Sequence, residues 1–168
     1  RYYLGKFLMV DEKAKKTLLR YIPHPINICG VKEGDEVNGF TLSWTTQASF
    51  KPPMIVIGVR QDSRSHAMIK ASQVFAVSFL DKSQQKIAET FFQPQIKVEN
   101  RFGEYEFYLS EITGCPVLKE ALGYVECNVK GSLEEGDHSI FLGEVVGARL
   151  HREGDPLWLM DTKWQYGG

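Results

Sequence analysis

Alternating polar side chains occupy one face of a predicted strand over residues 38–49. Side chains of alternate strand residues point to the same face, so a row of hydroxyl and amide groups is formed by Thr41, Ser43, Thr45, Gln47 and Ser49. Trp44 and Thr46 fall on the opposite face, and the segment begins with Asn38-Gly39. Such a row could hydrogen-bond a polar ring system, although a solvated strand face gives the same pattern.

A second polar segment, residues 60–66, joins a predicted strand to a predicted helix. Free N–H groups at a helix N-terminus, the hydroxyls of Ser63 and Ser65, and the guanidinium of Arg60 or Arg64 together suit a phosphate. A helix cap beside a solvated arginine is the alternative interpretation. Together with the polar strand before it, this segment could hold one end of a phosphorylated ring cofactor.

The common catalytic motifs are absent from the sequence. No GxGxxG follows a strand, and there is no GxxxxGK[ST], HExxH or GxSxG. The four histidines fall on different predicted elements without ligand spacing, at His24, His66, His138 and His151. No metal site is therefore predicted.

Composition narrows the class of protein. The 168 residues predict one domain over 1–168, and a net charge of −1 gives no field that would attract nucleic acid. No apolar run reaches the roughly 18 residues of a membrane span. Residues 1–10 are too short and too interrupted for a signal peptide, and the three cysteines form no CxxC pair. We therefore expect a cytoplasmic protein with no membrane partner.

Runs of β-branched and aromatic residues between turn signals predict about seven strands. They cover residues 26–31, 38–49, 54–60, 74–80, 105–109, 124–133 and 139–150. Short helices are predicted over 11–20, over 67–71 and after a capping box at Asp81, with a helical turn in 115–122. Such short helices cannot connect every strand pair, so we expect a mainly antiparallel β-barrel. The polar segment 93–103 is interpreted as a loop that could form a lid.

Several groups of residues carry a resemblance to a known family. They are RYIPHP at 20–25, Asn38-Gly39 with SFKPP at 49–53, SRSH at 63–66, FAVSFL at 75–80, GDH at 136–138 with GEV at 143–145, and WQYGG at 164–168. In this order, the sequence resembles the flavin reductase-like, FMN-binding split-barrel family from Arg20 onward. The resemblance implies a Greek-key split barrel and a homodimer that holds FMN at or near the subunit interface.

The resemblance also implies site residues. In the family the polar strand holds the isoalloxazine and ribityl groups, and the strand-to-helix turn holds the phosphate. The implied cofactor-binding residues are Asn38, Trp44, Thr45, Thr46, Gln47, Ser49, Arg60, Ser63, Arg64, Ser65, His66 and Trp164. His138 is the implied catalytic residue, near the flavin or its nicotinamide partner; a hairpin histidine bonded to a backbone carbonyl is the alternative.

The implied function is that of an NAD(P)H-dependent flavin reductase. Hydride would pass from NAD(P)H to N5 of FMN, with FAD as the other flavin, and reduced flavin could serve a partner monooxygenase. The alternative is a flavoredoxin-like electron carrier with tightly bound FMN, no nicotinamide site and an electron-acceptor protein as partner. A pyridoxamine-phosphate-oxidase-type split barrel is less favoured, because the motifs match the reductase-like branch.

Overall fold

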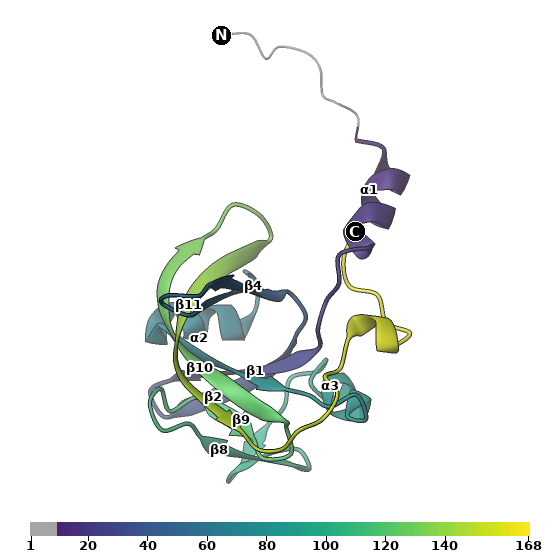
Figure 1. Cartoon of the computed structure of the whole chain (residues 1–168). Helices are drawn as coiled ribbons and strands as arrows, with labels where there is room; N and C mark the ends of the chain where they lie inside the picture. The colour runs from purple at the N-terminus through teal and green to yellow at the C-terminus, as the bar shows by residue number, and fades with distance from the viewer. Residues whose placement is uncertain (1–9) are drawn as a thin grey trace.

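The computed structural model describes residues 10–168, and most of its elements are strands (Figure 1). The larger sheet has the order β2-β1-β5-β10-β11-β4-β3. Its strands are β1 Asn27–Glu33, β2 Glu36–Leu42, β3 Thr45–Ser49, β4 Met54–Arg60, β5 Val74–Phe79, β10 Gly123–Leu133 and β11 His138–Leu150. The smaller sheet, in the order β6-β7-β8-β9, contains β6 Lys97–Val98, β7 Arg101–Phe102, β8 Tyr105–Leu109 and β9 Pro116–Leu118. The helices are α1 Glu12–Arg20, α2 Arg64–Ser72, α3 Gln85–Thr90 and the 3-10 turn η1 Leu159–Asp161.

The larger sheet is antiparallel and open. Every strand pair of the described residues is antiparallel, and the two edge strands, β2 and β3, follow each other in the chain. Helix α2 contacts β1, β2 and β4, so it spans the two sides of the opening. The prediction of a mainly β, antiparallel split barrel is confirmed.

The core has two main parts. Ile57, Phe75 and Phe141 of the larger sheet are buried together with Met68 and Ile69 of α2. A second cluster lies between the two sheets and α3. Burial of these apolar side chains is the main driving force for folding. It fixes β4, β11 and α2, the elements that contribute the candidate site.

Capping residues explain where two helices begin. The Asp11 carboxylate accepts hydrogen bonds from the N–H groups of Lys13 and Ala14, and α1 begins at the next residue. Ser63 Oγ accepts from the His66 N–H, and α2 begins at Arg64. Both predicted helices are confirmed, as are six of the seven predicted strands to within a few residues.

The prediction of one continuous strand over residues 38–49 is wrong. The chain leaves β2 after Leu42 and starts β3 at Thr45, so the polar residues divide between opposite edges of the sheet. The break falls at Ser43 and Trp44, where the Trp44 carbonyl accepts the Gly58 N–H at 2.8 Å and its ring lies over Gly58. A Cβ on Gly58 would lie 3.2 Å from that ring, so a larger residue would require a small shift of the indole.

Two further predictions are corrected by the small sheet and α3. The expected helical turn at 115–122 is wrong, because the fully buried segment Pro116–Leu118 pairs with β8 as a strand. The helix after Asp81 is only six residues long. The carboxylate of Asp81 accepts hydrogen bonds from Ser83 and forms a turn ahead of α3, so it does not cap the helix.

The segment 93–103 is more regular than the expected loop. It contains β6 and β7, which form a hairpin that continues onto β8. No helix within residues 10–168 has the length and apolar character that crossing a membrane requires. The expectation that the N-terminal stretch is not a signal peptide rests on residues 1–9, which lie outside the described residues.

Candidate functional site

A cavity opens where the end of β4 meets the start of β11. The register pairs Arg60 with His138, and the Gln61 N–H donates to the Asp137 carbonyl at 2.9 Å. The cavity measures about 540 Å³ and is lined by Trp44, Arg60, Gln61, Asp62, Asp137, His138, Tyr166, Gly167 and Gly168. We call it the Trp44–His138 cavity. Its size is in the range of small-molecule sites.

Three aromatic rings line this cavity together. The ring centroids of Trp44 and His138 are 4.3 Å apart, and those of Trp44 and Tyr166 are 5.1 Å apart. The indole N–H of Trp44 is buried and has no hydrogen-bond partner within residues 10–168. A buried donor without an acceptor costs about 1–3 kcal/mol. The three rings that line the cavity suit a planar ring as the ligand.

Charged groups surround the same cavity. The guanidinium of Arg60 donates two hydrogen bonds to the Asp62 carboxylate, at 3.0 and 2.7 Å, and this pairing lowers the pKa of Asp62. The Asp137 carboxylate accepts from Nδ1 of His138 at 2.7 Å, which lowers the pKa of Asp137. Both carboxylates therefore stay ionised at neutral pH.

The predicted phosphate turn is a hydrogen-bonded network at the start of α2. Asn38 Nδ2 donates to Ser65 Oγ at 2.9 Å, and Arg64 pairs with the Glu36 carboxylate. His66 Nε2 lies 2.7 Å from Ser139 Oγ, and burial lowers the pKa of His66. Ser65 and His66 are buried, whereas the ion pair of Arg64 is exposed. Arg60 and Arg64 are thus the two cations of this turn that a phosphate can reach, each of them already paired with a carboxylate.

The polar residues of β3 lie on an edge strand. Within the described residues β3 pairs only with β4, so one side of its backbone is left for other partners. Thr45 Oγ1 donates to the Val56 carbonyl, and Thr46 and Gln47 are exposed. Ser49 ends the strand and is half-buried. An unpaired strand edge with polar side chains fits the carbonyl and N–H groups of a flavin ring.

The structure brings some predicted residues together and separates others. Trp44, Arg60 and His138 line one cavity, beside the network at the start of α2. Trp164 lines neither described cavity, because its ring packs edge-on against Phe92 with centroids 4.7 Å apart. The hairpin of residues 93–103 also contributes nothing to the Trp44–His138 cavity.

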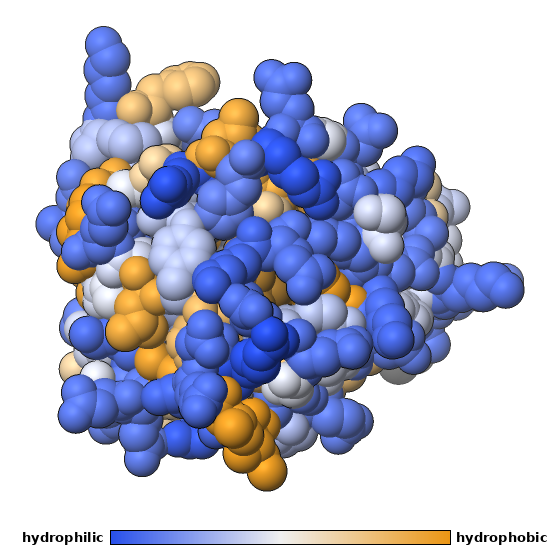
Figure 2. Space-filling view, turned by 90° about the horizontal axis from the view of Figure 1, so that it is seen from below, coloured by the Kyte–Doolittle hydropathy of each residue, from blue (hydrophilic) through white to orange (hydrophobic). Residues whose placement is uncertain are grey.

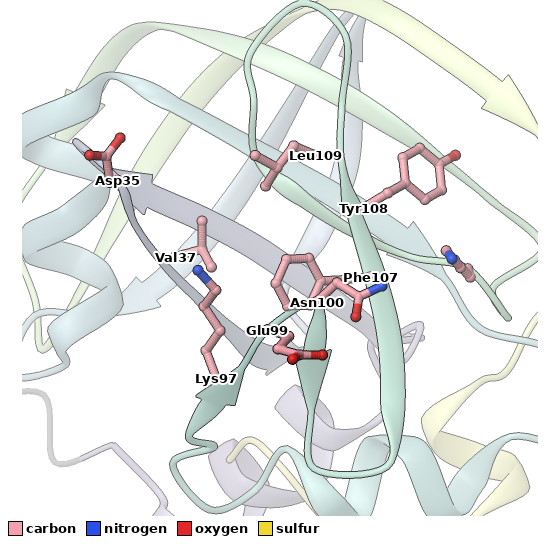
Figure 3. Close-up of a pocket in the computed structure, with 9 residues that line it drawn as sticks. Asp35, Val37, Lys97, Glu99, Asn100, Phe107, Tyr108 and Leu109 are labelled. Atoms are coloured by element: carbon pink, nitrogen blue, oxygen red, sulfur yellow. The ribbon is translucent and has the colours of Figure 1, made fainter.

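A second, smaller cavity lies beside that hairpin (Figure 3). It measures about 300 Å³, and its walls come from the turn before β2, the hairpin and β8. Val37, Phe107 and Leu109 contribute its apolar surface, with Lys97 and Glu99 nearby. None of the predicted site residues lines it. The predicted lid segment therefore borders a different hollow from the candidate site.

Sequence reasoning missed several residues of the Trp44–His138 cavity. Asp137 and Tyr166 both bond His138, and both lie within motifs that carried the family resemblance. Asp62 lies within the predicted phosphate turn. The motifs that contain these three residues could have indicated them as site residues. Only the fold shows that the three line one cavity.

Comparison with known proteins identifies the family. A profile described as "Flavin reductase like domain" matches residues 19–168. The NADH-dependent FAD reductase of Streptomyces globisporus is 33% identical over 83% of this chain and 79% of its own length. The reductase component of a Rhodococcus opacus 4-nitrophenol 4-monooxygenase/4-nitrocatechol 2-monooxygenase is 34% identical over 71% of this chain and 61% of its own.

The fold agrees with these sequence matches. A structure of the Streptomyces globisporus NADH:FAD oxidoreductase, in complex with NAD and FAD fragments, superposes with a TM-score of 0.71. It is 32% identical and covers 84% of each chain. The chain therefore belongs to the flavin reductase-like family, whose members are oxidoreductases that act on flavin.

Proposed function

We propose that this protein binds a flavin and reduces it with a nicotinamide dinucleotide. The observation that supports the proposal most is the Trp44–His138 cavity, which is lined by three aromatic rings and by Arg60. The edge strand β3 begins directly after Trp44, and the turn with Ser63 and Arg64 follows Asp62. When bound, the flavin supplies the hydride acceptor. The protein's own contribution is to hold and orient both ring systems and to limit the access of water.

Each group of residues has a separate task in this proposal. The edge strand β3 and Trp44 bind the flavin ring, and the turn that contains Ser63 and Arg64 binds its phosphate. His138 orients the nicotinamide donor. The lowered pKa values of Asp62 and Asp137 keep both carboxylates negative, which disfavours an additional phosphate near the cavity. We therefore propose NADH as the preferred donor.

Mixing the protein with NADH and FMN or FAD tests this function directly. Loss of the reduced-nicotinamide absorbance should be fast with the protein and slow without it. The same experiment with NADPH ranks the donors. A protein that binds flavin, fails to oxidise either nucleotide and passes electrons from dithionite to an acceptor protein would be a flavoredoxin-like carrier.

Arg64→Ala should weaken the binding of FMN about tenfold and leave riboflavin binding nearly unchanged. The lost contact is a charge-assisted hydrogen bond to phosphate, which riboflavin does not have. Quenching of flavin fluorescence on titration measures both affinities. Arg101→Ala is the matched control, because Arg101 is also exposed and pairs with a glutamate, the half-buried Glu106, but lies on β7. Equal losses for the two flavins would remove the phosphate role from Arg64.

We also propose that the protein is a homodimer. Large apolar side chains remain exposed, among them Phe50 at 86% beside β3 and Leu150 at 69% on β11. The underside of the molecule in Figure 2 has separate apolar patches on a hydrophilic surface, so no single large patch marks the interface there. Light scattering should give about twice 19.1 kDa. A monomer that still binds flavin would exclude a flavin site at the interface.

We further propose that the reduced flavin is used by a second protein. A relative named as the reductase component of a monooxygenase supports a partner monooxygenase as the acceptor. The three cysteines are free and buried, which supports the expectation of a cytoplasmic setting. Hydroxylation by a candidate monooxygenase, dependent on this protein and NADH, would test the partnership.

A further inference from the structure

Both ring nitrogens of His138 have hydrogen-bond partners. Nδ1 lies 2.7 Å from the Asp137 carboxylate, and Nε2 lies 2.7 Å from the Tyr166 hydroxyl. An ionised carboxylate only accepts hydrogen bonds, so the proton of the neutral imidazole is on Nδ1. Nε2 then accepts, and the phenol of Tyr166 donates to it. The Tyr166 oxygen is left with acceptor capacity only.

The chain around Tyr166 fixes its position over the cavity. Upstream, Trp164 packs against Phe92; downstream, Arg20 Nε donates to the Gly167 carbonyl at 3.1 Å. The C-terminal end of the chain lies beside α1 in Figure 1. Tyr166 is 41% exposed and lines the cavity together with His138. Burial raises the pKa of Tyr166, which keeps the phenol protonated.

We infer that Tyr166 recognises the carboxamide of the nicotinamide donor, with His138 and Asp137 holding the phenol in its accepting orientation. This inference rests on the proposed function. A primary carboxamide carries N–H donors, which match an oxygen that can only accept. A carboxylate in the same place has no donor to offer. The chain Tyr166–His138–Asp137 would therefore distinguish an amide from an acid on the nicotinamide ring.

A comparison of two donors tests the inference in the flavin-loaded protein. NADH is compared with reduced nicotinic acid adenine dinucleotide, which has a carboxylate in place of the carboxamide. For Tyr166→Phe, kcat/KM with NADH should fall about three- to tenfold, mainly through KM, because one hydrogen bond is lost. The value for the acid analogue should stay the same, so the donor preference falls by that factor. Tyr21→Phe is the control, because Tyr21 is exposed outside the cavity.

A second measurement does not require flavin or turnover. Ring 15N spectra of His138 in the flavin-free protein should show the Nδ1–H tautomer, with the signals assigned from their loss in His138→Asn. Asp137→Ala should shift this population toward a mixture of tautomers, whereas Tyr166→Phe, which keeps the Asp137 carboxylate, should leave it unchanged. A tautomer that does not depend on Asp137, or an unchanged donor preference in Tyr166→Phe, would overturn the inference. If the native protein oxidises no NADH, the proposed function fails, while the 15N spectra still report on the hydrogen-bond chain.

Discussion

His138→Ala should slow the reduction of bound flavin by NADH about 100-fold. The imidazole packs at a tilt against Trp44, bonds Tyr166 and lies opposite Arg60 across the β4–β11 pair. Its loss leaves the donor free to bind in non-productive orientations, and misplacement by about 1 Å is enough for an effect of this size. In stopped flow, excess NADH should bleach the oxidised flavin band at the lower rate.

His151→Ala is the matched control for this experiment. His151 also bonds a tyrosine, Tyr108, at 2.6 Å, but it lies outside the Trp44–His138 cavity. Flavin affinity should change by less than about twofold in His138→Ala, since other residues hold the cofactor. An unchanged bleaching rate would assign His138 to structure alone. A parallel loss of flavin affinity would make it a cofactor-binding residue.

Glu126→Ala should lower the free energy of unfolding by about 3–5 kcal/mol. This carboxylate is 2% exposed on β10 and accepts hydrogen bonds from the N–H groups of Ile112 and Thr113 and from the Thr113 hydroxyl. Hydrogen bonds to a charged group contribute about 1.5–3 kcal/mol each, and their loss leaves buried donors without partners. Urea denaturation at pH 7 measures the change.

The control for this stability measurement is Glu135→Ala. Glu135 is exposed in the turn between β10 and β11, and its removal should change the unfolding free energy by less than about 0.5 kcal/mol. The loss of unfolding free energy in Glu126→Gln should lie between those of Glu126→Ala and Glu135→Ala, because glutamine keeps one acceptor oxygen. If Glu126→Ala matched Glu135→Ala, the turn at 110–114 would not depend on the buried carboxylate.

Local patterns in the sequence were sufficient to predict most elements of the fold. The run Val74–Phe79 is β-branched and aromatic, and Ser63 caps α2, so neither depends on distant residues. The break at Trp44 could not be predicted, because the polar alternation continues through it. The Trp44 carbonyl accepts the N–H of Gly58, a residue on another strand, and so belongs with the β3–β4 pair. The strand Pro116–Leu118 likewise depends on its burial against β8.

The candidate site was predictable in its chemistry and only partly in its geometry. The polar edge strand and the turn at Ser63 are visible as residue types, because hydroxyl and guanidinium groups are scarce within apolar strands. The register that places His138 opposite Arg60 comes from pairing between distant parts of the chain. No local pattern encodes that pairing, and the contact of Tyr166 with His138 likewise emerged only with the fold. Asp137, in contrast, is the sequence neighbour of His138.

The position of β11 between β10 and β4 has a consequence for local stability. Among the strands of residues 10–168, the hairpin of β3 and β4 joins the rest of the larger sheet only through β11. If β11 detaches from β10, the edge strand β3 and Arg60 of β4 move away together with β11, and the two halves of the cavity separate. Amide hydrogen exchange in β3, β4 and β11 should therefore follow one opening reaction. A flavin bound as proposed, in contact with both sides of the cavity, would slow the exchange of all three strands together.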